Sequence, residues 1–168
     1  MTGVPPEVKL LGAEDLFERA RACSRDASYI NRRLATMESA EGVRGQSYEP
    51  TVSHTKQDVN GTARVVARMD YEGRMRERLD YDYAVIDYVS AVLYGTDCRS
   101  GLAALVGQQV ADLLDHRYLG CMTWEAASEA VGMSPSTSYR KAEMALDLID
   151  MYTPEVIMGG RGEAEDPD

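Results

Sequence analysis

Apolar residues recur at helical spacing along the first quarter of the chain. Between Gly12 and Gly42 the distance between successive apolar positions alternates between four and three residues. A heptad repeat of this kind is typical of a helix that packs lengthwise against a partner helix. The positions of this apolar seam are Leu16, Ala20, Cys23, Ala27, Ile30, Leu34 and Met37. The pattern therefore predicts one long helix over this range.

A second helical pattern covers Thr62 to Leu93. Residues 42–61, which separate it from the first, are rich in glycine and polar residues and have no helical period, so they predict a loop. The simplest arrangement is an antiparallel hairpin of two long helices over 12–94. The same seam would also allow a homodimer through the N-terminal helices. Glycine and polar residues over 94–100 break the pattern, and we expect a domain boundary there.

Three further helices are predicted in a second domain over 99–152. A broad amphipathic stripe runs from Gly101 to Leu119 and ends at Gly120. A short helix from Trp124 to Val131 follows, and the hydroxyl of Thr123 is placed to cap its first turn.

The last of these helices has a clear start. Gly132 is suited to the left-handed conformation of a tight turn. Ser134 at the cap and Pro135 at the first helical position then begin a helix that runs to Tyr152. Two short helices joined by a glycine-containing turn form a helix-turn-helix pattern. On the last helix, Ser136 and Arg140 point away from the apolar face, with Thr137 and Tyr139 on its flanks.

The composition is that of a soluble globular protein and excludes several classes. Three widely spaced cysteines, Cys23, Cys98 and Cys121, predict reduced thiols rather than disulfides or a zinc site. Two histidines leave little for a metal centre, and we expect no metal and no cofactor. Without a membrane-length apolar stretch or a secretion signal, we expect a cytoplasmic protein with no membrane partner. The acidic, glycine-rich tail over 159–168 is predicted to be disordered.

The sequence also predicts that the protein is not an enzyme. It has no glycine-rich phosphate loop, metal-spaced carboxylate pair or activated nucleophile. His116, Arg117 and Tyr118 are residue types used in strand-transfer chemistry, but three neighbours on one helix point in different directions.

One stretch of the second domain carries specific motifs. They are Thr123-Trp124-Glu125-Ala126-Ala127, Gly132-Met133-Ser134 and Ala145-Leu146, with Arg117-Tyr118-Leu119 upstream. In spacing they resemble, without a gap, region 4 of the sigma-70 family of RNA polymerase sigma factors. Over residues 14 to 150 the layout is similar to phage-encoded sigma-like late transcription regulators (the DUF1492, ArpU and RinA groups). Those proteins join an N-terminal helical hairpin to a C-terminal sigma-like helix-turn-helix.

The resemblance implies a transcription regulator whose last helix enters the major groove of double-stranded DNA at phage or mobile-element promoters. It also implies RNA polymerase as a partner. The residues implied for DNA contact are Thr123, Ser134, Pro135, Ser136, Thr137, Tyr139, Arg140 and Lys141. Arg140 would pair with guanine or phosphate, and Lys141 with phosphate. Trp124 is expected to anchor the packing of the module.

The motif departs from the family pattern at several positions. The family commonly has branched residues where Ala127 and Ser138 stand, and basic residues where Pro135 and Ser136 stand.

The charge of the chain leaves two alternatives open. The net charge is −10, and residues 99–168 hold five basic and twelve acidic side chains. Because neutralisation of phosphates supplies non-specific affinity, this balance predicts weak DNA binding by the isolated module. The first alternative is a helical protein-interaction adaptor that does not bind DNA. The second is a DNA-binding protein like a terminase small subunit.

Overall fold

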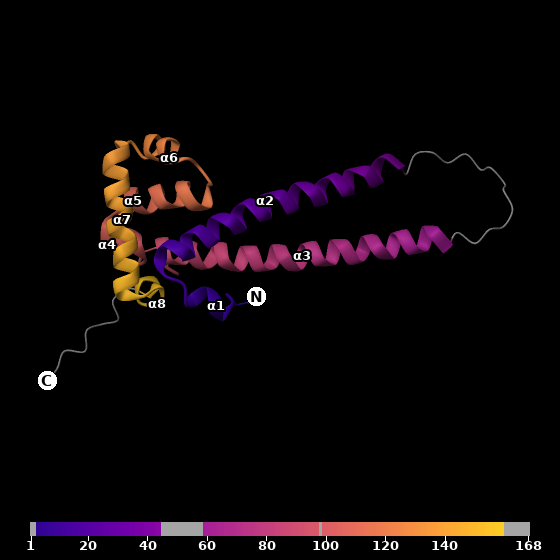
Figure 1. The fold of residues 1–168 in the computed structure, drawn as a ribbon, viewed down its shortest axis with the longest axis horizontal. Coiled ribbons are helices and arrows are strands. Elements are labelled where there is room, and N and C mark those ends of the chain that lie inside the picture. Colours follow the sequence, from indigo (N-terminus) through magenta and orange to yellow (C-terminus); the bar gives the residue numbers. More distant parts are fainter. Residues whose placement is uncertain (1–2, 45–58, 98, 160–168) are drawn as a thin grey trace.

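Helices make up the regular structure of this protein. The computed structural model describes residues 3–44, 59–97 and 99–159, and these contain no β-strand. Figure 1 shows a long two-helix projection attached to a body of shorter helices. The predicted all-α fold class is confirmed.

The projection consists of α2 (Ala13–Arg44) and α3 (Val59–Tyr94), which run side by side in opposite directions (Figure 1). The inner part of the apolar seam is buried within this one chain, and its residues are Leu16, Ala20, Cys23, Ala27 and Ile30. Leu34 and Met37, farther out, are only half-buried. Both helices extend into the predicted 42–61 loop, and residues 45–58 of that loop lie outside the described residues.

Polar contacts join α2 and α3 where the apolar burial ends. Arg78 donates to both carboxylate oxygens of Asp26 at 2.7 Å. Asn31 Nδ2 donates to the Tyr83 hydroxyl at 2.9 Å, and Arg68 donates to the Met37 carbonyl at 3.1 Å. These contacts join the two helices through side chains that are partly exposed to water.

One buried cluster joins the base of this projection to the body. From α2 it includes Leu16 and Phe17, and from α3 it includes Val89 and Leu93. The body contributes Leu102, Val110, Ala111, Leu113, Leu114, Tyr118, Ala127, Ala142, Ala145, Ile149 and Ile157. The cluster thus contains residues from both sides of the predicted boundary at 94–99.

The amphipathic stripe predicted as one helix over 101–119 is divided into three segments, so that prediction was wrong in detail. The segments are α4 (Leu102–Val106), α5 (Gln108–Leu114) and the π-helical turn η1 (Asp115–Leu119). The first break falls at Gly107, whose φ of +94° with ψ of 150° is a conformation open mainly to glycine. After η1 the chain turns at Gly120, whose N–H bonds to the Asp115 carbonyl.

The two short helices that follow begin where the capping residues predicted. They are α6 (Trp124–Ala130) and α7 (Pro135–Tyr152), and Gly132 between them has a φ of +69°. Short helices also lie at the two ends of the described chain: α1 (Pro6–Lys9) and α8 (Pro154–Met158). Except for Gly159, the predicted disordered tail over 159–168 lies outside the described residues.

Candidate nucleic-acid interface

The first turns of α7 have one buried side and one open side. Ser138, Ala142 and Ala145 are at most 2% exposed and pack into the body. On the other side Ser136 and Arg140 are exposed, as the helical periodicity predicted. Because the described chain leaves this outer side uncovered, a partner molecule has direct access to it.

The hydroxyls at the two helix starts are engaged in capping. Thr123 Oγ1 accepts a hydrogen bond from the Ala126 N–H at 3.2 Å, which confirms the predicted cap of α6. Ser134 Oγ accepts from the Thr137 N–H at 3.4 Å and donates to Thr137 Oγ1 at 2.8 Å. These three side chains therefore fix the helix starts, and fewer of their donors and acceptors remain for a ligand.

The remaining predicted contact residues differ in exposure. Pro135 is exposed at the first position of α7, and Lys141 is half-buried. Tyr139 is 49% exposed, and its ring lies 4.7 Å from the Trp124 ring, centroid to centroid, at a tilt of 40°. This contact places the start of α6 beside the second turn of α7, so the predicted residues form one continuous region.

Trp124 anchors the packing of this region, as predicted. Its ring meets the Tyr118 ring edge-on at 6.2 Å, and Tyr118 in turn meets Phe17 of α2 edge-on at 5.3 Å. Such edge-to-face pairs each add a fraction of a kcal/mol to about 1.5 kcal/mol beyond the burial of area. A chain of rings thus connects the exposed Tyr139 to the centre of the core.

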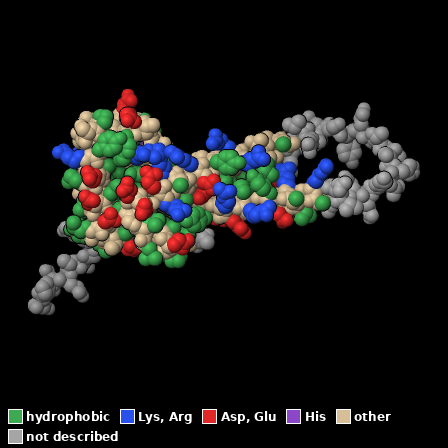
Figure 2. Space-filling model, in the orientation of Figure 1, with side chains coloured by type: hydrophobic (Ala, Val, Ile, Leu, Met, Phe, Trp, Pro, Cys, Tyr) green, Lys and Arg blue, Asp and Glu red, His purple; other side chains and the backbone are tan. Residues whose placement is uncertain are grey.

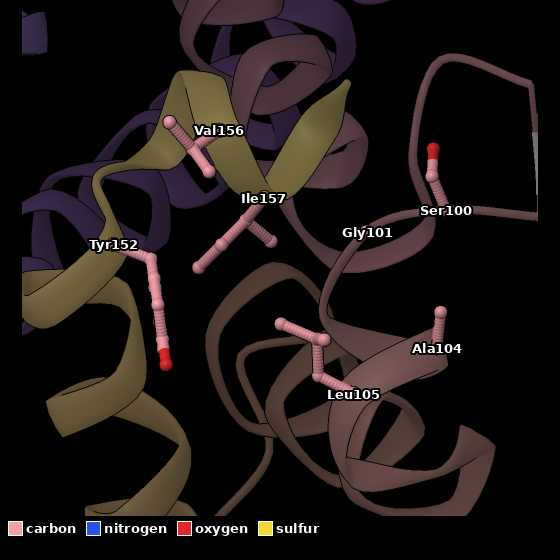
Figure 3. A pocket seen from close by; sticks show the side chains of 7 residues that line it. All are labelled: Ser100, Gly101, Ala104, Leu105, Tyr152, Val156 and Ile157. Carbon is pink, nitrogen blue, oxygen red and sulfur yellow. The ribbon is translucent and has the colours of Figure 1, made fainter. Parts of the chain in front are cut away.

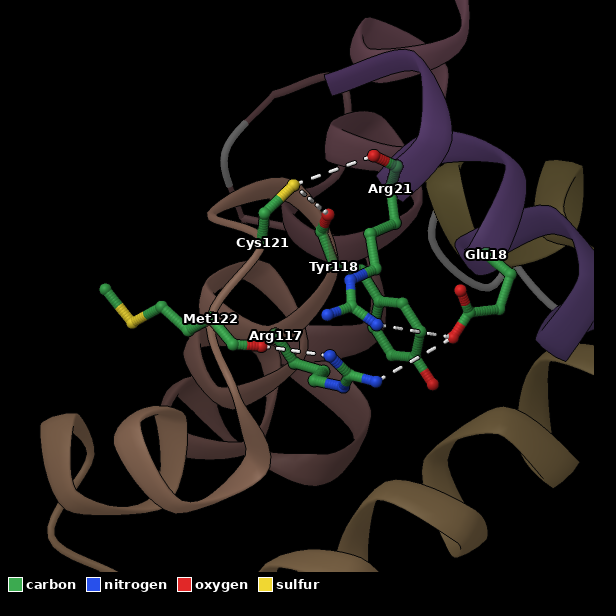
Figure 4. A network of polar contacts seen from close by, with 6 residues as sticks. All are labelled: Glu18, Arg21, Arg117, Tyr118, Cys121 and Met122. Atoms are coloured by element: carbon green, nitrogen blue, oxygen red, sulfur yellow. Dashed lines mark hydrogen bonds and ion pairs between the residues drawn. The ribbon is translucent and has the colours of Figure 1, made fainter. Parts of the chain in front are cut away.

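Arg117 is a positioning residue, a role that the sequence analysis did not predict for it. Its guanidinium lies 5.2 Å from the centroid of the Trp124 ring and 5.6 Å from that of Tyr118. Figure 4 shows Arg117 donating to the Met122 carbonyl, at 2.9 Å, and reaching toward Glu18 of α2, at 3.9 Å. The guanidinium therefore ties the turn before α6 to α2.

Two further contacts, made by Cys121 and Ser24, join α2 to the turn after η1 and to the end of η1. Arg21 Nη1 lies 3.9 Å from the same Glu18 oxygen, and Cys121 Sγ lies 3.6 Å from the Arg21 carbonyl (Figure 4). Ser24 Oγ donates to the Leu119 carbonyl at 2.6 Å. The orientation of the helix-turn-helix segment is thus set by α2, far away in the sequence.

An acidic cleft lies beside the candidate interface. It has a volume of about 570 Å³, and Trp124 and Tyr139 form part of its wall. Its carboxylates come from α2 and from the later turns of α7: Glu14, Glu18, Glu143, Asp147 and Asp150. A cleft lined by this many carboxylates repels phosphate groups.

A smaller apolar pocket of about 100 Å³ lies near the other end of α7. Figure 3 shows Leu105 of α4 and Ile157 of α8 pointing toward one another, with Tyr152 of α7 nearby. The remaining lining residues are Ser100, Gly101, Ala104 and Val156. No charged side chain lines this pocket, and the side chains of Ser100 and Tyr152 supply its polar groups.

The described residues contain little that would support metal or thiol chemistry. They include no group of three or more histidine, cysteine and carboxylate side chains able to hold a metal ion. Burial raises the pKa of the Cys23 thiol to about 12, so this thiol stays protonated at neutral pH. Cys23 and Cys121 are unpaired, and Cys98 lies outside the described residues. None of the described helices has the length and apolar character needed to span a bilayer.

No protein-family model, curated protein or solved structure matched the chain in the comparisons.

Proposed function

We propose that this protein is a DNA-binding transcription regulator similar to sigma-70 region 4, with no enzymatic role. In this proposal the segment from α5 to α7 forms the helix-turn-helix unit, attached to the α2–α3 hairpin. The observation that supports it is the pair of capped helices α6 and α7. The first turns of α7 are open on one face and fixed on the other by Ser138, Ala142 and Ala145.

The first two turns of α7 would enter the major groove. A groove about 12 Å wide admits a helix, and the exposed side of α7 carries Ser136, Tyr139 and Arg140. Arg140 would donate two hydrogen bonds to a guanine edge or grip a phosphate. Ser136 and Lys141 would contact the backbone, whereas Ser134 and Thr123 would act by holding the helix starts.

RNA polymerase would supply part of the affinity. The exposed carboxylates Glu125 and Glu129 lie on α6, and the acidic cleft lies on the other flank of α7. Their repulsion of phosphates weakens binding by the protein alone. A sigma-like regulator that is bound to polymerase at a phage or mobile-element promoter needs few contacts of its own with the DNA. A homodimer through the N-terminal helices would raise the affinity in the same way.

The test is binding to a promoter duplex at low salt, with and without the host polymerase. Arg140→Ala should lower the affinity about 5- to 150-fold, because one bidentate base contact contributes about 1–3 kcal/mol of discrimination. Arg99→Ala is the matched control, since Arg99 is also exposed but lies in the turn before α4. Equal affinities for the two variants, or no duplex binding with polymerase present, would contradict the proposal.

The protein-interaction adaptor is favoured by one observation, the acidic cleft with aromatic walls. A basic segment of another protein would place its cations against Glu143 and Asp147 and its stems against Trp124 and Tyr139. The double substitution Glu143→Gln/Asp147→Gln would then abolish partner binding, while Arg140→Ala would leave it unchanged. The reverse result supports the DNA-binding function.

A further inference from the structure

The outward side of α2 carries a row of arginines that the proposed function has not used. Arg25, Tyr29, Arg32 and Arg33 are all exposed, and their spacing of four, three and one residues places them on one side of the helix. This side is opposite the apolar seam that packs on α3. Tyr29, Arg32, Arg33 and Thr36 line a shallow depression there. We call Arg25, Tyr29, Arg32 and Arg33 the α2 arginine face.

The middle of α2, around this face, holds few carboxylates. Residues 19–37 contain five arginines and a single carboxylate, Asp26. Asp26 is held by both of its oxygens to Arg78 of α3. In the described part of the chain no carboxylate forms an ion pair with Arg25, Arg32 or Arg33.

The acidic side chains of the protein are concentrated elsewhere. Figure 2 shows Asp and Glu gathered over the body of short helices, whereas many of the Lys and Arg side chains lie over α2 and α3. The projection carries the arginine face away from the body (Figure 1). Charges separated by more than the Debye length, about 8–10 Å at physiological salt, are largely screened from one another. The net charge of −10 therefore does not cancel the local field of the face.

We propose that the α2 arginine face binds the phosphate backbone of duplex DNA, as a second contact in addition to the one made by α7. The inference rests on the proposed DNA-binding function for its choice of partner. Along a helix, Arg25 and Arg32 are about 10 Å apart, close to the width of about 12 Å of the major groove. Their guanidinium groups would reach phosphates on both edges of one groove. The planar donor fork of arginine matches phosphate oxygens, and the Tyr29 hydroxyl between them adds a donor.

The same face is poorly suited to a membrane or to a protein groove. An interfacial helix buries an apolar side in the lipid, but the apolar side of α2 is already packed against α3. Tyr29 is the only large apolar residue among the four, and it is 53% exposed. A stable protein interface needs an apolar centre, which this face lacks. Charge and hydrogen-bond donors dominate it, as in contacts to a nucleic-acid backbone.

The test measures binding of the full chain to a mixed-sequence duplex across a salt series starting near 50 mM. The variant is Arg32→Gln/Arg33→Gln, and the matched control is Lys9→Gln/Arg99→Gln, which removes the same charge from exposed sites on α1 and before α4. Each phosphate contact contributes about 0.9 to the slope of log K against log salt. We expect the salt-dependence slope of the variant to be smaller in magnitude by about two. Its affinity should fall tenfold or more, equally for all duplex sequences, and the control variant should keep both the slope and the affinity.

The outcomes separate this inference from the proposed function. If Arg140→Ala weakens binding but Arg32→Gln/Arg33→Gln leaves the slope unchanged, the arginine face is not a DNA contact and the regulator proposal stands. If the double variant lowers the slope but Arg140→Ala has no effect, the face binds DNA and the role of α7 is wrong. Loss of binding to phosphatidylserine vesicles with unchanged duplex binding would assign the face to membranes and overturn the inference. Unchanged circular dichroism shows that the variants are folded.

Discussion

Arg117 shows how one side chain can hold a candidate interface in place without belonging to it. Its guanidinium lies over Trp124 and Tyr118, donates to the Met122 carbonyl and reaches Glu18 of α2, yet its side chain is only 12% exposed. Cation–π contacts and a hydrogen bond to a carbonyl each contribute on the order of 1 kcal/mol when shielded from water. The position of Trp124, and through it that of Tyr139, therefore depends on the planar shape of this group.

Arg117→Lys tests that dependence, because it keeps the charge and removes the planar group. We expect the free energy of unfolding to fall by about 1–3 kcal/mol, since a compact ammonium lacks the planar surface that stacks on the rings and the fixed fork of donors that guanidinium has. Urea denaturation, monitored by the fluorescence of Trp124, measures this free energy. Arg99→Lys, at an exposed site, should change stability by less than about 0.5 kcal/mol. An equally small effect of both substitutions would show that charge alone matters at position 117.

Asp82 is a carboxyl group buried between α2 and α3. It is 4% exposed, and its Oδ2 has no hydrogen-bond partner within the described chain. Burial raises its pKa above the ordinary value, and the nearby Asp26 adds to this. A hydrogen bond from the Cys23 thiol and the charge of Arg78 act in the opposite direction. The folded protein therefore binds a proton at Asp82 more tightly than the unfolded chain does.

Because of this shift, protonated Asp82 makes its full contribution to stability below the ordinary pKa of about 4. That contribution is lost as the pH rises through the raised pKa of the folded protein. Asp82→Asn stays neutral throughout. Its free energy of unfolding relative to the natural protein should therefore increase between about pH 4 and pH 7. Urea titrations at several pH values measure the trend, with Asp80→Asn at an exposed site as the control. A difference that does not vary with pH would mean that Asp82 is ionised in the folded state across this range.

At the scale of whole elements, the starts of α6 and α7 were predictable and the division of α4 from α5 was not. Thr123 and Ser134–Pro135 act locally, since a cap needs only the backbone N–H groups of the next turn. The break at Gly107 has no local signal of that strength. Apolar residues continue on both sides of it at helical spacing, and a lone glycine is often tolerated inside a helix. The break is fixed by the packing of Leu102 and Val110 into the same core, and the sequence does not show that packing.

Two glycines provide a matched test of this break. Neither Gly107 nor Gly73 has any atom within 4 Å of the position where a Cβ would lie, so only the backbone differs between them. Gly73 lies within α3, and alanine there should raise the free energy of unfolding by about 0.5–1 kcal/mol. Gly107→Ala should lower it by about 1–3 kcal/mol, because φ is +94°. Thermal unfolding would give opposite shifts, and a stabilising Gly107→Ala would mean that α4 and α5 merge into one helix.

At the scale of the molecule, the candidate interface depends on residues far from it in the sequence. The residues of α7 that face outward were predictable from helical periodicity. The ring contact between Phe17 and Tyr118, which connects α2 to the helix-turn-helix segment, was not. Heptad spacing shows that α2 has a partner but does not identify it, and Leu16 and Phe17 contribute to a cluster shared with α5, η1 and α7. The hairpin therefore supports α7 as well as carrying the α2 arginine face.

Substitutions at Phe17 and Ile30 distinguish the support that α2 gives to α7 from its packing within the hairpin. Both are fully buried, but Phe17 belongs to the cluster that includes Tyr118 and Ala142, whereas Ile30 lies outside that cluster, farther along the hairpin. Truncating either to alanine should cost about 2–5 kcal/mol, through lost burial and a cavity. Native-state hydrogen exchange shows which helices lose amide protection in each variant. In Phe17→Ala the amides of η1 and α7 should exchange faster relative to those of the outer hairpin, and in Ile30→Ala the order should reverse. The same exchange pattern in both variants would show that hairpin and body unfold as one unit, and that α2 does not hold α7 through Phe17 in particular.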